Sequence, residues 1–169
     1  PNENERPDTI SSHPMDANKL FALYSSEYPY IFISDDNGGA WRGATLQDWP
    51  DWLKMGPSPR IFYDHSQGKR VYIIQSAFVF RSDNAGDSWQ VCPLWDVTLG
   101  STNRQAGMIV QPENADQLIL ATRGNGILVS TDGCQTWQES NSGLDSLFVN
   151  TIASDPNNPD IIYIGTDGG

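Results

Sequence analysis

An eight-residue motif that recurs at one fixed spacing is the feature of this sequence that most limits its fold. The motif begins at Ser34, Ser82 and Ser130, so successive copies lie 48 residues apart. The copies read Ser34-Asp35-Asp36-Asn37-Gly38-Gly39-Ala40-Trp41, Ser82-Asp83-Asn84-Ala85-Gly86-Asp87-Ser88-Trp89 and Ser130-Thr131-Asp132-Gly133-Cys134-Gln135-Thr136-Trp137. Three copies in register at one period indicate a repeat protein, in which each unit buries its apolar face against the next.

Each motif follows a turn and an apolar run. The turns are rich in Pro, Asn, Asp and Gly, and the apolar runs cover residues 20–23, 71–74 and 118–121. A fourth turn and apolar run, at 161–164, has no motif after it. Such turns and runs predict short strands joined by tight connections. In the third unit we predict strands over 106–110, 117–122, 126–130 and 136–140. Four short antiparallel strands in a repeat of this length predict an all-β fold, a β-propeller of four-stranded blades.

The repeat spacing also predicts how the chain is divided. The expected blades cover 8–47, 58–99, 104–144 and 148–169, the last one incomplete, within a single partial propeller domain of about 3.5 blades. Because a closed ring requires more blades than this, we expect a longer polypeptide or other subunits to supply the remaining blades.

The motif residues themselves are expected to be structural. The acidic or amide side chain accepts hydrogen bonds from its own turn, glycine permits positive φ, and the indole packs between sheets. This structural set is Ser34, Asp36, Gly38, Trp41, Ser82, Asn84, Gly86, Trp89, Ser130, Asp132, Cys134 and Trp137. The third motif position supplies one carboxylate per turn, or none where Asn84 replaces Asp, which is too few for a calcium site of six to eight oxygens. No metal and no cofactor is therefore expected.

The motif pattern Ser-x-Asp-x-Gly-x-Thr-Trp resembles the Asp-box, and the chain resembles the Asp-box (BNR) repeat propellers from about Asp8 to Gly169. That group includes sialidases, xyloglucan-cleaving glycoside hydrolases, sortilin-type receptor ectodomains and photosystem II assembly factors. The chain departs from the pattern at Ala40, Asn84 and Cys134. The last of these implies a non-glycine residue in a left-handed conformation.

Charge excludes some partners. The chain carries 21 Asp and Glu against 10 Lys and Arg, a formal net charge of −11. Duplex nucleic acid and anionic membranes require a basic surface, so neither is expected as a partner, and no run is apolar enough for insertion into a membrane.

The low lysine content favours an extracytoplasmic or secreted location. The two cysteines, Cys92 and Cys134, show no framework spacing, which favours unlinked thiols over a disulfide.

The expected function is binding or assembly. In a propeller the motif turns share one end of the blades, and the loops at the opposite end carry the ligand site, so glycan or protein is the expected partner. The segment 46–60 is the richest of these loops, with two Trp and two Asp within 48–52. The candidate ligand-binding residues are Tyr28, Tyr30, Trp49, Asp51, Trp52, Arg60, Trp95, Arg104, Arg123 and Asn125.

The alternative is part of a glycoside hydrolase. A xyloglucanase-like enzyme requires two opposed carboxylates, for which Asp48, Asp51 and Asp167 are the candidates. A sialidase-like enzyme would use an arginine triad, and Arg60, Arg104 and Arg123 lie on successive units, but no Arg-Ile-Pro motif accompanies them.

Overall fold

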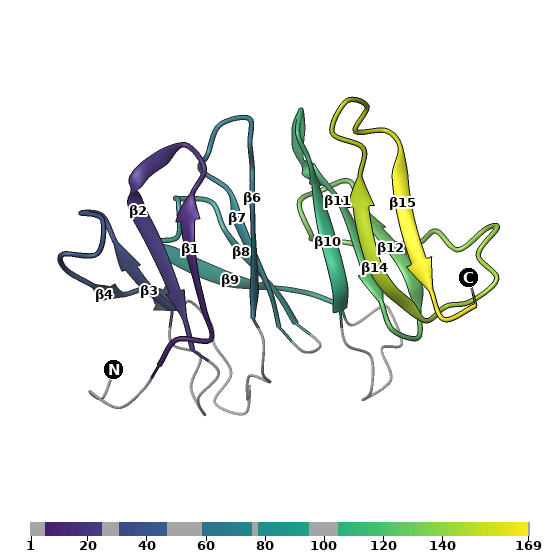
Figure 1. Ribbon diagram of the computed structural model, residues 1–169, viewed down its shortest axis with the longest axis horizontal. Helices are drawn as coiled ribbons and strands as arrows, with labels where there is room; N and C mark the ends of the chain where they lie inside the picture. Colours follow the sequence, from purple (N-terminus) through teal and green to yellow (C-terminus); the bar gives the residue numbers. More distant parts are fainter. Residues whose placement is uncertain (1–5, 25–30, 47–58, 76–77, 95–104, 169) are drawn as a thin grey trace.

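The fold consists of β-strands alone. The computed structural model describes residues 6–24, 31–46, 59–75, 78–94 and 105–168. Within these ranges there are fifteen strands in four sheets and no helix. The sheets stand side by side along the chain, from the purple N-terminal sheet to the yellow C-terminal one (Figure 1).

Consecutive strands pair in order within each sheet. The first sheet holds β1 (Thr9–His13), β2 (Asp16–Leu23), β3 (Ile31–Ser34) and β4 (Arg42–Gly43). The third holds β10 (Gln105–Gln111), β11 (Asn114–Thr122), β12 (Gly126–Ser130) and β13 (Gln138–Glu139). The fourth holds β14 (Val149–Ser154) and β15 (Ile162–Thr166). All pairs in these three sheets are antiparallel.

The second sheet has an additional strand. Its antiparallel strands are β6 (Arg60–Tyr63), β7 (Val71–Gln75), β8 (Phe78–Ser82) and β9 (Ser88–Cys92). The short strand β5 (Thr45–Leu46), which follows the first sheet in the chain, pairs in parallel with the outer strand β9. The first sheet is therefore tied to the second through the backbone.

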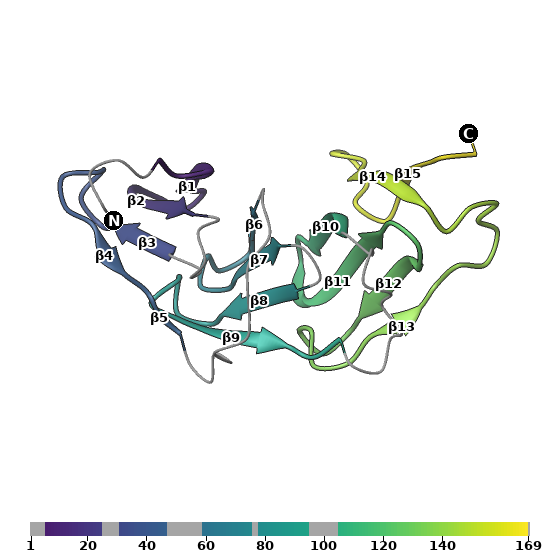
Figure 2. The ribbon, with the colours of Figure 1, turned by 90° about the horizontal axis from the view of Figure 1, so that it is seen from below.

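The sheets are arranged as the blades of a β-propeller. In Figure 2 the first strands β1, β6, β10 and β14 lie along the concave side of an arc, and β4, β9 and β13 lie along its convex side. The chain thus forms three four-stranded blades and part of a fourth, as the repeat predicts.

Apolar side chains from alternate strand positions fill the spaces between neighbouring sheets. Phe21 and Ile33 of the first sheet pack with Val71, Ile73 and Trp89 of the second. A second core lies between the second and third sheets, and a third between the third and fourth. Because successive residues of a strand point to opposite faces, the central strands of the second and third sheets each contribute to two cores.

The three motif turns share one hydrogen-bond pattern. The serine Oγ accepts the N–H of the fifth motif residue at 2.8, 2.8 and 2.9 Å, and the third residue's Oδ1 accepts the N–H of the seventh at 2.8, 2.9 and 2.9 Å. Asn84 Oδ1 accepts from the Ser82 hydroxyl and from the Ser88 N–H, and Oδ1 of Asp36 and of Asp132 accepts the same two bonds, because a single side-chain oxygen suffices. Cys134 has a φ of 75°, so the third turn keeps this geometry with a left-handed non-glycine residue, as predicted.

The prediction that all three indoles pack between sheets is wrong for Trp41. Trp89 and Trp137 are buried, each against the sheet that precedes its own, whereas Trp41 is 40% exposed. Trp41 belongs to the first described sheet, so no earlier sheet covers its ring.

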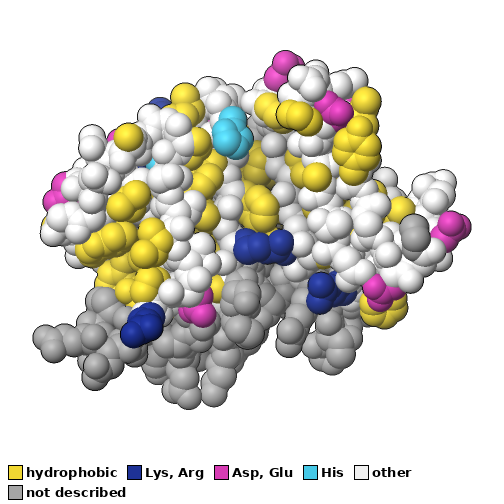
Figure 3. Space-filling view, viewed as in Figure 1, with side chains coloured by type: hydrophobic (Ala, Val, Ile, Leu, Met, Phe, Trp, Pro, Cys, Tyr) yellow, Lys and Arg dark blue, Asp and Glu magenta, His cyan; other side chains and the backbone are white. Residues whose placement is uncertain are grey.

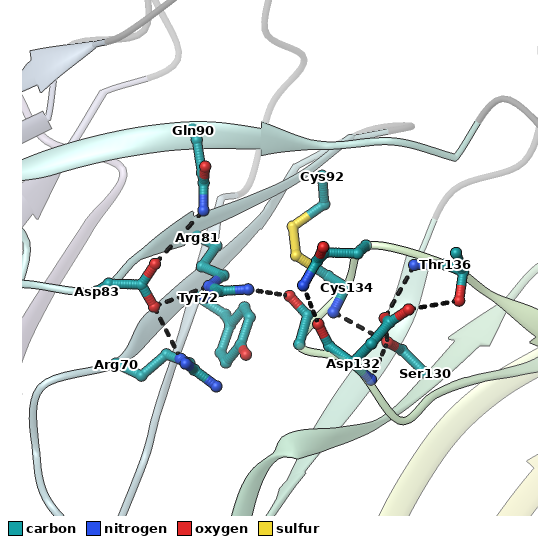
Figure 4. Close-up of a disulfide and its surroundings, with 12 residues drawn as sticks. Arg70, Tyr72, Arg81, Asp83, Gln90, Cys92, Ser130, Asp132, Cys134 and Thr136 are labelled. Carbon is teal, nitrogen blue, oxygen red and sulfur yellow. Dashed lines mark hydrogen bonds and ion pairs between the residues drawn. A yellow bond between two sulfur atoms is a disulfide. The ribbon is translucent and has the colours of Figure 1, made fainter.

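The preference for unlinked cysteines is also wrong. Cys92 at the end of β9 and Cys134 in the turn of the third sheet form a disulfide, with Cα atoms 5.5 Å apart (Figure 4). The two residues are 42 positions apart in sequence, but the packing of adjacent sheets brings them within bonding distance.

Candidate functional site

The two ends of the blades have different roles. At the turn end, the motif turns bond to the β-hairpin turns of the same sheet: Asn37 N–H to Asn18 O, Ala85 N–H to Lys69 O and Gly133 N–H to Asp116 O. The two sets of turns therefore lie at the same end of the blades. The opposite end, where β6 and β10 begin and β11 and β15 finish, is called the loop end below.

The described candidates of the loop end come from three sheets. Arg60 begins β6, Arg123 and Asn125 follow β11, and Asp167 follows β15. The candidates Tyr28, Tyr30, Asp48, Trp49, Asp51, Trp52, Trp95 and Arg104 lie outside the described residues.

Phe148 is a loop-end residue that the sequence reading missed. Its side chain is 54% exposed, although aromatic rings are usually buried. Its backbone pairs with Arg123 in an isolated antiparallel bridge, and its carbonyl accepts the Asp167 N–H at 3.1 Å. The backbone of Phe148 is thus fixed between Arg123, which follows the third sheet's β11, and Asp167, which follows the fourth sheet's β15. The density of Trp and Asp in the loops does not indicate Phe148, because Phe148 is an isolated aromatic residue at a junction between two sheets.

Asp167 is fixed as well as exposed. Its carboxylate accepts a hydrogen bond from the side-chain amide of Asn150 on β14, the strand that pairs with β15. The carboxylate therefore has a defined position beside the backbone of Phe148.

Arg60 extends this surface towards the second sheet. Its Nη2 donates to the carbonyl of Gln105 on β10 at 3.0 Å. Partial burial lowers the pKa of Arg60, and the positive charge of Arg123 lowers it further. The described loop end therefore combines two neighbouring guanidinium groups with Phe148, Asn125 and Asp167. Figure 3 shows basic side chains gathered over the groove between the second and third sheets.

At the turn end, a polar pocket of about 340 Å³ separates the second and third sheets. Arg70 lines it and forms ion pairs with Asp83 and Asp116, and Arg81 joins Asp83 to the carbonyl of Gly133 (Figure 4). These interactions connect adjacent blades, and we assign them to structure.

Hydrogen bonds within the motif turns lower the pKa of the turn-end carboxyl groups and so favour their ionised form. The Ala40 N–H lowers the pKa of Asp36, and the Thr136 hydroxyl and N–H lower the pKa of Asp132 to about 2. A general acid requires the opposite shift, so neither carboxyl group has the raised pKa of a general acid. No group of three His, Cys, Asp or Glu suited to a metal ion occurs among the described residues. Within the same residues, no helix is long and apolar enough to cross a membrane.

Comparison with known proteins supports the propeller assignment. No protein-family profile matches the chain. An oligoxyloglucan-reducing end-specific xyloglucanase from Emericella nidulans is 24% identical over 174 aligned residues, which cover 92% of this chain. The chain spans only 21% of the length of that relative.

Solved structures resemble the chain at low sequence identity. A GH74 enzyme from Niastella koreensis has a TM-score of 0.68 at 16% identity, covering 96% of this chain and 26% of that one. An ancestral GH74 enzyme has a TM-score of 0.68 at 19% identity, covering 98% and 22%. YCF48 from Cyanidioschyzon merolae has a TM-score of 0.56 at 14% identity, covering 88% and 47%. These likenesses show the fold, which is that of a β-propeller.

Proposed function

We propose that the chain forms blades of a glycoside-hydrolase-like propeller and that its loop end binds a glycan. The observation that carries this proposal is the exposed side chain of Phe148, whose backbone is fixed by bonds to the backbones of Arg123 and Asp167.

The chemistry of this surface suits a sugar. The apolar face of a pyranose ring stacks on an aromatic side chain, while its hydroxyls bond to carboxylate, guanidinium and amide groups around it. The backbone of Phe148 is fixed on both sides, and its N–H also donates to Ser146 Oγ at 3.2 Å. A fixed platform loses little conformational entropy when a ligand binds.

The relative with a xyloglucanase name supports a β-glucan such as xyloglucan as the ligand.

We further propose that the three motifs are Asp-box repeats. Their identical hydrogen bonds support this assignment, because a family motif is maintained by its geometry.

We also propose that further blades complete the propeller beyond the predicted segments 8–47, 58–99, 104–144 and 148–169. Trp41 on the first sheet and Tyr163 on the fourth are 40% and 57% exposed on faces that correspond to buried faces elsewhere in the repeat. A longer polypeptide or other subunits would cover them. The Cys92–Cys134 disulfide favours an extracytoplasmic or secreted location, where disulfides persist.

Glycan binding is tested by calorimetric titration of the full-length protein with xyloglucan oligosaccharides. Phe148→Ala is expected to weaken binding at least about tenfold, because stacking on the ring is lost. Met15→Ala is the control, since Met15 is an equally exposed apolar residue in the turn between β1 and β2, at the turn end. Equal affinities for wild type and Phe148→Ala, or binding of a protein partner with no glycan binding, would contradict the proposal.

Hydrolysis is the second candidate function. The position of Asp167 beside Phe148 favours it, because a glycosidase places carboxylates around the bound sugar. The second carboxylate would come from Asp48, Asp51 or a further blade. Release of reducing ends from xyloglucan, and its loss in Asp167→Asn with glycan binding retained, is the expected result for an enzyme. Absence of turnover in the full-length protein would leave binding as the function.

A further inference from the structure

Arg60 differs from the other arginines that join neighbouring sheets. Arg42 forms ion pairs with Asp35 and Asp87, and Arg70 forms ion pairs with Asp83 and Asp116. Arg60 also reaches from one sheet to the next, but its hydrogen-bond partner among the described residues is the neutral carbonyl of Gln105. In a chain of net charge −11, carboxylates are plentiful, so a cation at a sheet junction that bonds to a carbonyl and, among the described residues, to no carboxylate is unexpected.

Sheet register brings Arg123 close to the same point. Gln105 pairs with Thr122 across β10 and β11, and Arg123 is the next residue along the chain. The two guanidinium groups are near enough for the charge of Arg123 to disfavour the charged form of Arg60. Like charges in such proximity are retained at sites where a ligand of opposite charge separates them.

The side chain of Gln105 provides a third polar group. Its amide nitrogen and oxygen are both buried and have no hydrogen-bond partner among the described residues. Buried amides are normally paired, so an orphaned one on the residue whose carbonyl accepts from Arg60 indicates a place for a ligand atom.

We propose that Arg60, Gln105 and Arg123 form a subsite for a carboxylate group of the bound glycan, as in a uronic acid residue. A planar carboxylate matches the forked donors of a guanidinium, and the amide N–H₂ of Gln105 supplies a further donor. The strong negative charge of the chain disfavours multiply charged polyanions and leaves a singly charged group as the better ligand. This subsite rests on the proposed glycan-binding function, because Arg123 also flanks Phe148.

The test is calorimetric titration of the full-length protein with a cello-oligosaccharide that carries one glucuronic acid residue and with its methyl ester. The two ligands differ in charge but share the same sugar rings. We expect the acid to bind about tenfold more tightly than the ester at low salt. Arg60→Gln is expected to bring the ratio close to one, and Arg60→Lys to keep part of it.

Arg42→Gln is the control, because it removes an arginine from the turn end and is expected to leave the ratio as in wild type. Equal affinity of wild type for acid and ester, or an undiminished ratio in Arg60→Gln, overturns the subsite. If the neutral oligosaccharide still binds in that case, the subsite alone fails. If no glycan binds, the proposed function fails with it. Preference for a short peptide with a free C-terminal carboxylate over every glycan overturns the assignment to a uronic acid.

Discussion

Cys92 and Cys134 form a disulfide at the junction between the second and third sheets. The junction between the first and second sheets has a backbone pairing instead. One 48-residue period earlier, the corresponding residues are Ala44 and Gly86. At that junction Thr45 pairs in parallel with Ser88. The counterpart of Thr45 is Pro93, which has no N–H to donate. The disulfide therefore lies next to a residue that cannot donate a backbone hydrogen bond to such a strand pairing.

Removal of the disulfide is expected to destabilise the protein by about 4 kcal/mol, because it closes a loop of 42 residues in the unfolded chain. The replacement at position 134 matters, since Cys134 has a φ of 75°. The double variant Cys92→Ala/Cys134→Gly should be about 1 kcal/mol more stable than Cys92→Ala/Cys134→Ala. Urea denaturation of both variants measures the difference. Equal stabilities would show that the turn carries no left-handed strain.

Gly86 is expected to tolerate no side chain. Its φ is +95°, and a Cβ atom would lie 2.3 Å from Cε1 of Phe21 in the core between the first two sheets. Gly143 has a φ of +87° with nothing within 4 Å and is the matched control. Gly143→Ala should cost about 1 kcal/mol from backbone strain alone, and Gly86→Ala about 2 kcal/mol more. Thermal unfolding compares them, and similar costs would contradict the packing described for Phe21.

The indoles should differ in importance despite their identical motif positions. Trp89 is buried between two sheets and its Nε1–H donates to Gly86 O at 2.8 Å, whereas Trp41 is 40% exposed. Trp89→Ala should lower stability by about 3–5 kcal/mol. Trp41→Ala should cost less than about 1 kcal/mol in the isolated 169-residue chain. A large loss for Trp41→Ala in the full-length protein would be the result expected if a further blade covers that ring.

Acid is expected to weaken the third motif turn. The Thr136 hydrogen bonds lower the pKa of Asp132 from 3.8 to about 2, so the folded state favours the carboxylate. Its contribution is present above pH 3.8 and is lost as the pH falls towards 2. Asp132→Asn keeps the oxygen acceptor, as Asn84 does in the second turn, and removes this dependence. The melting temperatures of wild type and Asp132→Asn, measured from pH 5 down to pH 2.5, should approach each other as the pH falls. Parallel curves would contradict the assigned hydrogen bonds.

The sequence predicted the strands well where local chemistry determines them. The predicted strand 126–130 coincides with β12, and 106–110 lies within β10, because turn residues and apolar runs mark their limits. The fourth strand predicted over 136–140 is reduced to Gln138–Glu139, since it pairs only on one side.

Relations between sheets were harder to predict. The exposure of Trp41, the disulfide and the position of Phe148 all depend on which sheet lies beside another. A comparison of repeat positions would have placed Cys92 near Cys134, because Ala44 and Gly86 occupy the same junction. Phe148 carries no such signal, since its backbone bridge to Arg123 depends on how the third and fourth sheets lie against each other.

Glycan binding at the loop end is tested most directly by hydroxyl-radical footprinting with mass spectrometry, in the presence and absence of xyloglucan oligosaccharides. Phe148, Trp41 and Tyr163 are all exposed and therefore oxidisable in the free chain. Saturating ligand is predicted to protect Phe148 and to leave Trp41 and Tyr163 oxidised at their original rates. Unchanged oxidation of Phe148 at saturation, or protection confined to Trp41 or Tyr163, would contradict a glycan site at the loop end.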